Sequence, residues 1–319
     1  MRIAATRLLF LACAFLAAGG ALAQVYPVKP VRVVTASAGG ALDITLRLIA
    51  QGISGSLGQQ VIIENRPSSV HPEDALARAA PDGYSLLYYA NTLWLAPFLR
   101  AKLPYDPQKD FAPICLTVRG PNVIVVHTSL PVKSVAELVA LAKAKPSELN
   151  VAITGVGTSP TMAAVLFQSM TGAKLTNIAY KGSAQAFNDL RAGRVEVMFP
   201  TVASSLPLVR SGQVRALAVT SAEPSPLAPD LPTAVAAGIP GYESVAIHGL
   251  FAPAKTPQAI ITRLNQEVVK FLTNAEAKDK INKMGFDIIA STPDQLSATI
   301  KAEMERMGKV IREAGLQPQ

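Results

Sequence analysis

The hydrophobic pattern alternates along the chain between short runs rich in β-branched residues and longer stretches with a helical repeat. The valines of residues 31–34 form the first short run, which is typical of a buried strand. Over residues 42–53, leucines and isoleucines recur every three or four positions, which predicts a helix with one apolar face packed on a sheet. Gly39 and Gly40 stand between the two segments and predict a tight turn that lets the backbone approach another group closely.

The same alternation continues through the rest of the chain. Strands are expected at residues 61–65, 85–90, 123–127, 149–153, 175–180, 195–199, 214–220 and 244–251. Helices are expected at residues 74–80, 134–145, 160–170, 185–191, 204–210, 257–272 and 295–314. The prolines of residues 103–113 predict a loop, because neither a helix nor a central strand readily contains proline. Alternating strands and helices predict α/β architecture with mostly parallel sheets.

A second glycine turn, at residues 155–157, repeats the pattern of the first. Ser159 follows it as the expected N-cap of a helix, with Pro160 as the first helical residue. At both turns, the free N–H groups and the positive end of the helix dipole favour a bound carboxylate or phosphate. The alternative is an ordinary βα turn, which needs glycine just as often.

Two α/β units that open with such turns predict two lobes joined by hinge strands, with a ligand cleft between them. Residues 223–232 are rich in proline and mark a linker, and the hinge strands are expected near residues 123–127 and 244–251. We expect one lobe to comprise residues 24–126 and 247–319, and the other residues 127–246. A chain of 319 residues that is 50% hydrophobic is large enough for both cores.

The first 23 residues have the features of a secretory signal peptide: two arginines, an apolar run and an A-x-A cleavage site. They predict export to the periplasm, with a lipoprotein anchored through Cys13 as the alternative. Cleavage leaves Cys115 as the only cysteine, so the mature chain has no intramolecular disulfide.

The formal charge of +8 is scattered along the chain, which favours attraction of small anions over binding of nucleic acid. An exported enzyme is the rival class. The chain lacks G-x-S-x-G and H-E-x-x-H, its glycine turn lacks the third glycine of a dinucleotide site, and its three histidines have no metal-ligand spacing. We therefore predict no catalytic residue, cofactor or metal, and a monomer.

A series of motifs covers essentially the whole mature chain. They are Gly-Gly-x-x-Asp at 39–43, ENRP at 64–67, APDGY at 80–84, LPYDPQKDFAPI at 103–114, GVGTSP at 155–160, YKGSAQAF at 180–187, LRAGRVEVMF at 190–199, VRALAVTS at 214–221 and GLFAPAKTP at 249–257. Each is weak alone, but in this order they are highly specific. The chain resembles the Bug family, the periplasmic solute-binding receptors of tripartite tricarboxylate transporters.

The resemblance implies a type II periplasmic-binding fold whose ligand is a small carboxylate. Backbone amides, hydroxyls and bridging waters of the two glycine turns would hold the ligand, and the loaded receptor would dock on the large and small membrane subunits of a transporter. A ligand-sensing partner of a signalling system shares the fold and is the alternative. The contacts that carry over from the family are Ser37, Gly40, Asp43, Gly157, Thr158, Ser159 and Ser183.

Two departures from the family pattern bear on the ligand. Ser68, Ser69 and His71 stand where the family has a glycine-rich run, and Pro200 stands where aspartate is common. His71 either contacts the ligand or lies on a loop that bends into solvent. The remaining candidates for the ligand site are Gly39, Asn91, Tyr180 and His248.

Overall fold

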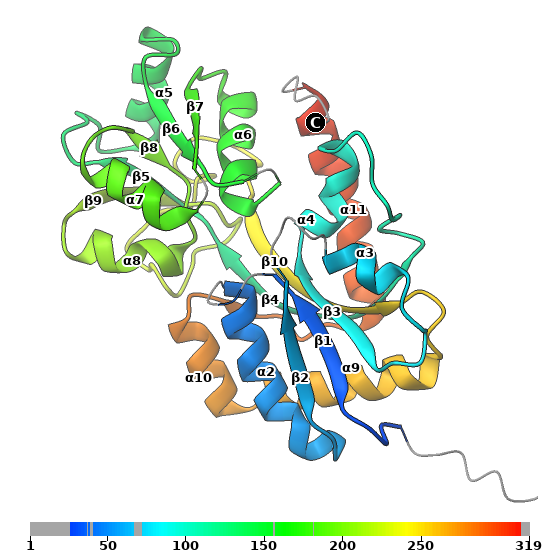
Figure 1. Ribbon diagram of the computed structural model, residues 1–319. Coiled ribbons are helices and arrows are strands. Elements are labelled where there is room, and N and C mark those ends of the chain that lie inside the picture. The colour runs from blue at the N-terminus through cyan, green and yellow to red at the C-terminus, as the bar shows by residue number, and fades with distance from the viewer. Residues whose placement is uncertain are drawn as a thin grey trace, which may run out of the picture.

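The computed structural model describes residues 26–36, 38, 41–66, 72–155, 157–180 and 182–313. The strands form two separate sheets, one of six strands and one of five, each covered by helices (Figure 1). This confirms two α/β lobes. The predicted signal peptide and six of the candidate site residues lie outside the described residues: Ser37, Gly39, Gly40, Ser68, Ser69 and His71.

The larger sheet has the strand order β11-β4-β10-β3-β1-β2. Its strands are β1 (Val31–Thr35), β2 (Val61–Asn65), β3 (Ser85–Ala90), β4 (Phe111–Pro121), β10 (Val245–Pro253) and β11 (Asp287–Ile288). Strands β1, β2 and β3 are parallel, whereas β10 runs antiparallel to both β3 and β4, and β11 runs antiparallel to β4.

The smaller sheet has the order β7-β6-β8-β5-β9. Its strands are β5 (Val123–His127), β6 (Asn150–Ile153), β7 (Thr176–Ala179), β8 (Val197–Met198) and β9 (Val214–Val219). Here β6, β7 and β8 are parallel, and β5 is antiparallel to β8 and β9. The prediction of mostly parallel sheets was wrong in both lobes, because antiparallel strands adjoin each parallel set.

Helices pack on both faces of the larger sheet. Helices α2 (Ala41–Leu57) and α9 (Gln258–Leu272) bury their apolar faces with the first valines of β1 on one side, and α10 (Ala275–Lys283) lies beside them. On the other side lie α3 (Pro72–Ala77), α4 (Thr92–Leu95), the 3-10 turn η2 (Ala96–Phe98) and α11 (Pro293–Glu313). The smaller sheet carries α5 (Val135–Ala144), α6 (Ser159–Thr171), α7 (Ser183–Arg191) and α8 (Val202–Arg210) (Figure 1).

The chain passes between the sheets twice, from β4 to β5 through Asn122 and from β9 to β10 through residues 220–244. The two passages are bonded to each other. The amide N–H of Asn122 donates to the Thr220 hydroxyl (2.8 Å), and that hydroxyl lies 2.6 Å from the carbonyl oxygen of Ser244. All three residues are buried. The predicted lobe boundaries lie close to these passages and stay a prediction, although β5 lies wholly in the smaller sheet.

The prediction of a loop through Pro113 was wrong, because β4 begins at Phe111 and includes this proline. Pro113 pairs with Phe251 of β10, while β11 covers only Val118 and Arg119 at the other end of β4. A proline fits there because the register between β4 and β10 shifts between Leu250 and Phe251, and irregularities of this kind are among the few places where a strand tolerates a missing N–H group. Helices α4 and α10 and strand β11 were not predicted.

The hinge bonds make Thr220 a test of how the lobes are joined. Thr220→Val keeps the shape of the side chain but leaves buried polar groups of Asn122 and Ser244 unpaired, so we expect it to lower the free energy of unfolding by about 1–3 kcal/mol. Thr220→Ser keeps the hydroxyl and serves as the matched control. Urea unfolding measures both, and equal stability of the valine and serine variants would contradict the role of this hydroxyl.

Candidate functional site

A cavity of about 570 Å³ lies between the lobes and is lined by residues of both. From the first lobe come Asn91, Thr92, Leu99, Arg100, His248 and Phe286, and from the second come Thr154, Gly155, Gly157, Thr158, Ser159 and Thr201. This volume is in the range of small-molecule sites. Of the residues predicted to contact a ligand, five line the cavity: Asn91, Gly157, Thr158, Ser159 and His248.

The second glycine turn forms one wall of the cavity. It leaves β6 at Ile153, and its glycines take positive φ angles of 109° at Gly155 and 76° at Gly157. The Thr158 hydroxyl lies within hydrogen-bonding distance of the Gly155 carbonyl oxygen (3.1 Å) and of the Thr161 hydroxyl (3.2 Å). These contacts fix the turn from within, so its shape does not depend on a ligand.

The expectation that Ser159 caps the following helix was wrong by one residue. Helix α6 begins at Ser159, and Thr158 is the extended N-cap residue, but its side chain makes no capping hydrogen bond. Pro160 lies in the first turn and has no N–H group. The N-terminus of a helix of 13 residues therefore lines the cavity without a side-chain cap, which favours a bound anion.

The lobes touch directly at this turn. A Cβ atom added to Gly157 would lie 2.9 Å from Cδ1 of Leu99 in the other lobe. A side chain at this position would therefore require the end of the Leu99 side chain to move aside.

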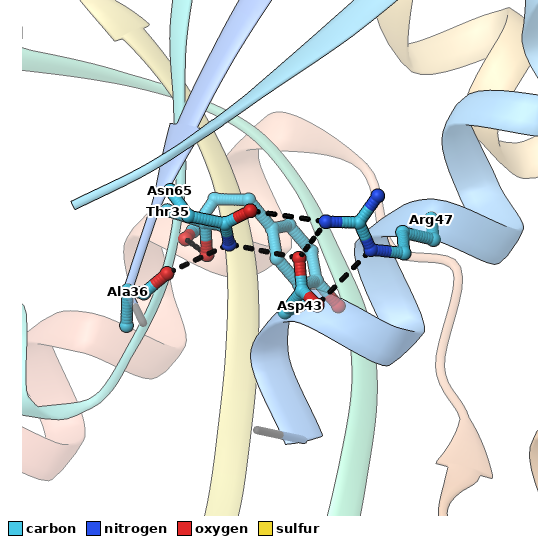
Figure 2. A network of polar contacts seen from close by, with 6 residues as sticks. Thr35, Ala36, Asp43, Arg47 and Asn65 are labelled. Carbon is cyan, nitrogen blue, oxygen red and sulfur yellow. Dashed lines mark hydrogen bonds and ion pairs between the residues drawn. The ribbon is translucent and has the colours of Figure 1, made fainter. Parts of the chain in front are cut away.

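A buried carboxylate at the start of α2 ties this helix to strands β1 and β2 (Figure 2). Asp43 is 2% exposed, and its two oxygens accept hydrogen bonds from Arg47 (2.9 and 3.0 Å) and from the side-chain amide of Asn65 (2.8 Å). The same amide donates to the carbonyl oxygen of Ala36 at the end of β1 (2.9 Å). Asp43 is not among the residues that line the cavity, and its contacts hold the first turn of α2 against the ends of β1 and β2. Its direct contact with a ligand stays a prediction.

The hinge side of the cavity carries Asn91 and His248. The Asn91 amide donates to the carbonyl oxygen of Val245 and to Glu303 (both 3.3 Å), and Trp94 donates to the same carboxylate (2.6 Å). Burial raises the pKa of Glu303, while these hydrogen bonds act in the opposite direction. Burial lowers the pKa of His248 to about 3, so its ring is neutral at physiological pH.

Arg100 and Glu73 also line the cavity, and neither was predicted from a sequence pattern. Glu73 is buried close to Tyr89 and Tyr105. Burial raises the pKa of both tyrosines, and the charge of Glu73 raises both further, whereas Arg100 lowers them. Arg100 brings positive charge to this end of the cavity. Thr92, Thr154, Thr201 and Phe286 were also missed.

Three other candidates lie away from the cavity lining. The Tyr180 hydroxyl donates to Asp189 (2.9 Å), Ser183 is the first residue of α7, and the carbonyl oxygen of Pro200 accepts from the N–H of Val123 (2.8 Å). None of the three lines the cavity, so their contact with a ligand stays a prediction.

Comparison with known proteins identifies the family. Residues 45–316 match the sequence model of the tripartite tricarboxylate transporter family receptor. The chain belongs to this family. The receptor is 33% identical to protein BugT of Bordetella pertussis over 319 residues, which cover 97% of this chain and 98% of BugT. The resemblance to Bug-family solute-binding proteins is thereby confirmed.

Two solved structures share the fold of the receptor. "R. palustris Rpa4515 with adipate" is 34% identical, with a TM-score of 0.83, and the match covers 92% of this chain and all of the other. MatC of Rhodopseudomonas palustris with bound malate is 31% identical, with a TM-score of 0.79 over 90% of this chain and all of that one. In the described part of the receptor, no helix is both long and apolar enough to span a bilayer.

The conformation and contact of Gly157 predict a cost for any side chain there. Gly157→Ala should lower the free energy of unfolding by about 1–3 kcal/mol, because alanine is strained at positive φ and its Cβ would meet the end of the Leu99 side chain. Gly212→Ala is the matched control, since Gly212 has a φ of 69° and open space around it. Urea unfolding measures both variants, and an equal loss of stability in the two would show that the contact with Leu99 contributes nothing.

The buried ring of His248 predicts a loss of stability in acid. The unfolded chain binds a proton near pH 6.5, whereas the folded ring does so only near pH 3, so stability falls as pH decreases between these values. From pH 7 to pH 5, this one group should cost the receptor about 2 kcal/mol. Urea unfolding in carboxylate-free buffer should therefore show a smaller decrease in the free energy of unfolding from pH 7 to pH 5 for His248→Phe than for the wild type. An identical decrease would mean that the folded ring takes up the proton.

Proposed function

We propose that the receptor is a periplasmic protein that captures a small organic acid between its lobes and delivers it to the membrane subunits of a tripartite transporter. The observation that carries this proposal is the uncapped N-terminus of α6 on the cavity wall. Its N–H groups and helix dipole are suited to one carboxylate. The neighbours that were solved with adipate and with malate support an acid as the ligand.

The lining of the cavity suits binding rather than catalysis. His248 is neutral and has a strongly lowered pKa, and the nearest described carboxylate of the lining, Glu73, is buried beside two tyrosines. The hydroxyls of Thr158 and Thr161 bond within the turn, so neither is paired with a general base. The site holds polar groups in fixed positions around a cavity, and we infer that the receptor is not an enzyme.

A thermal-shift screen of mono-, di- and tricarboxylates tests the proposal. A ligand that binds only the folded state at 100 times its Kd stabilises the receptor by about 2.7 kcal/mol, so a bound acid should raise Tm clearly. Each acid is compared with its neutral amide, for example adipate with adipamide, because the helix terminus should favour the charged form. The proposal fails if no acid raises Tm, or if an acid is consumed on incubation with the receptor.

A further inference from the structure

His248 lies in the middle of β10, the strand that enters the larger sheet from the second hinge passage. Its neighbours across the ladder are Ala90 of β3 and Val118 of β4. The residue is 3% exposed, yet it lines the hinge side of the cavity together with Ala246 and Phe286. The ring is therefore part of the protein core and of the cavity wall at the same time.

The polar atoms of this ring have no partner among the residues that the structure describes. Nδ1 is buried and makes no hydrogen bond with any described residue, and no described residue bonds the other ring nitrogen either. The ring packs against aromatic neighbours instead, with centroids 5.8 Å from Tyr88 and 4.9 Å from Phe286. A phenylalanine would make the same ring contacts without burying an unpaired nitrogen, which is destabilising. Packing alone therefore does not account for a histidine here.

We propose that His248 determines specificity by donating a hydrogen bond from its neutral ring to a second oxygen-bearing group of the ligand. Nδ1 is the ring nitrogen that is buried in the protein, so Nε2 is the nitrogen that can face the cavity. The tautomer that carries its proton on Nε2 is a hydrogen-bond donor there. The inference rests on the proposed function, in which the first carboxylate lies at the N-terminus of α6.

The ligand class follows from this arrangement. The wall with α6 and the wall with His248 belong to different lobes, so a ligand that contacts both bridges the cleft. A neutral donor suits a carboxylate, hydroxyl or carbonyl oxygen and offers nothing to a methyl group. The receptor should therefore prefer acids with oxygen groups at both ends over acids of the same length that end in a methyl group.

Calorimetry with matched pairs of acids tests the inference. Succinate and butyrate, glutarate and pentanoate, and adipate and hexanoate each share a chain length and differ in the second carboxylate. For the diacid that binds the wild-type receptor most tightly, His248→Phe should weaken binding roughly tenfold or more, because a hydrogen bond to a charged group is lost. Affinity for the matching monoacid should change less than twofold.

Two further variants keep the result decisive. His248→Leu also lacks ring nitrogens and replaces the phenylalanine variant if that one does not fold. His127→Phe makes the same exchange on β5, where the ring bonds Ser129 outside the cavity, and should leave both affinities unchanged.

The possible outcomes separate this inference from the proposed function. If the wild-type receptor binds no acid of any pair, the proposed function fails, and this inference fails with it. If the wild type binds a diacid but the His248 variants keep its full preference over the monoacid, only the inference is overturned. Equal weakening of both acids also overturns it, since that result indicates a structural role for the ring.

Discussion

The two passages between the sheets are bonded to each other, and this constraint shapes the rest of the receptor. Asn122 and Thr220 lie side by side, joined by the N–H of Thr220, which donates to the carbonyl oxygen of Asn122 (2.9 Å), and by the buried Thr220 hydroxyl. The Asn122 side chain also donates to the carbonyl oxygen of Phe199 at the end of β8 (2.7 Å). The hinge is therefore tied into the core of the second lobe, and the lobes can move as units about it.

Strand β10, which follows the second passage, brings the cavity close to the hinge. Strand β10 carries His248 into the cavity wall shortly after the second passage, and β4 lies beside it with no residue in the described lining. A ligand that contacts His248 therefore contacts a strand of the larger sheet that begins directly after the second passage. Recognition at this wall and movement about the hinge thus involve neighbouring parts of the same chain segment.

Much of the fold could be predicted from the sequence because it rests on local patterns. The strand–helix alternation and the glycine turn at residues 155–157 are visible in short windows, and the structure has them. The motif order identified the family for the same reason. Pro113 misled because its place in the strand depends on a register shift against β10, a strand distant in the sequence, which no local pattern contains.

The candidate site was less predictable, since it is assembled from distant segments. Gly157 and Thr158 were found because their turn has a local signature, whereas Arg100 and Glu73 reach the cavity only through the packing of α3, α4 and η2. The ligand contact predicted for Asp43 from the family resemblance stays a prediction, since the hydrogen bonds described for its carboxylate come from Arg47 and Asn65.

Two glycines show how the closeness of the lobes limits the sequence. Gly157 meets Leu99 on one side of the cleft, and Gly285, after α10, lies against Ala203 of α8 on another. Both have positive φ angles, so each is required by the backbone and by the opposite lobe at once. A Cβ atom on Gly285 would lie 2.7 Å from Cα of Ala203, which cannot turn aside, whereas at Gly157 only the end of the Leu99 side chain would have to move. The backbones of the two lobes therefore limit the residue at Gly285 more strictly than at Gly157.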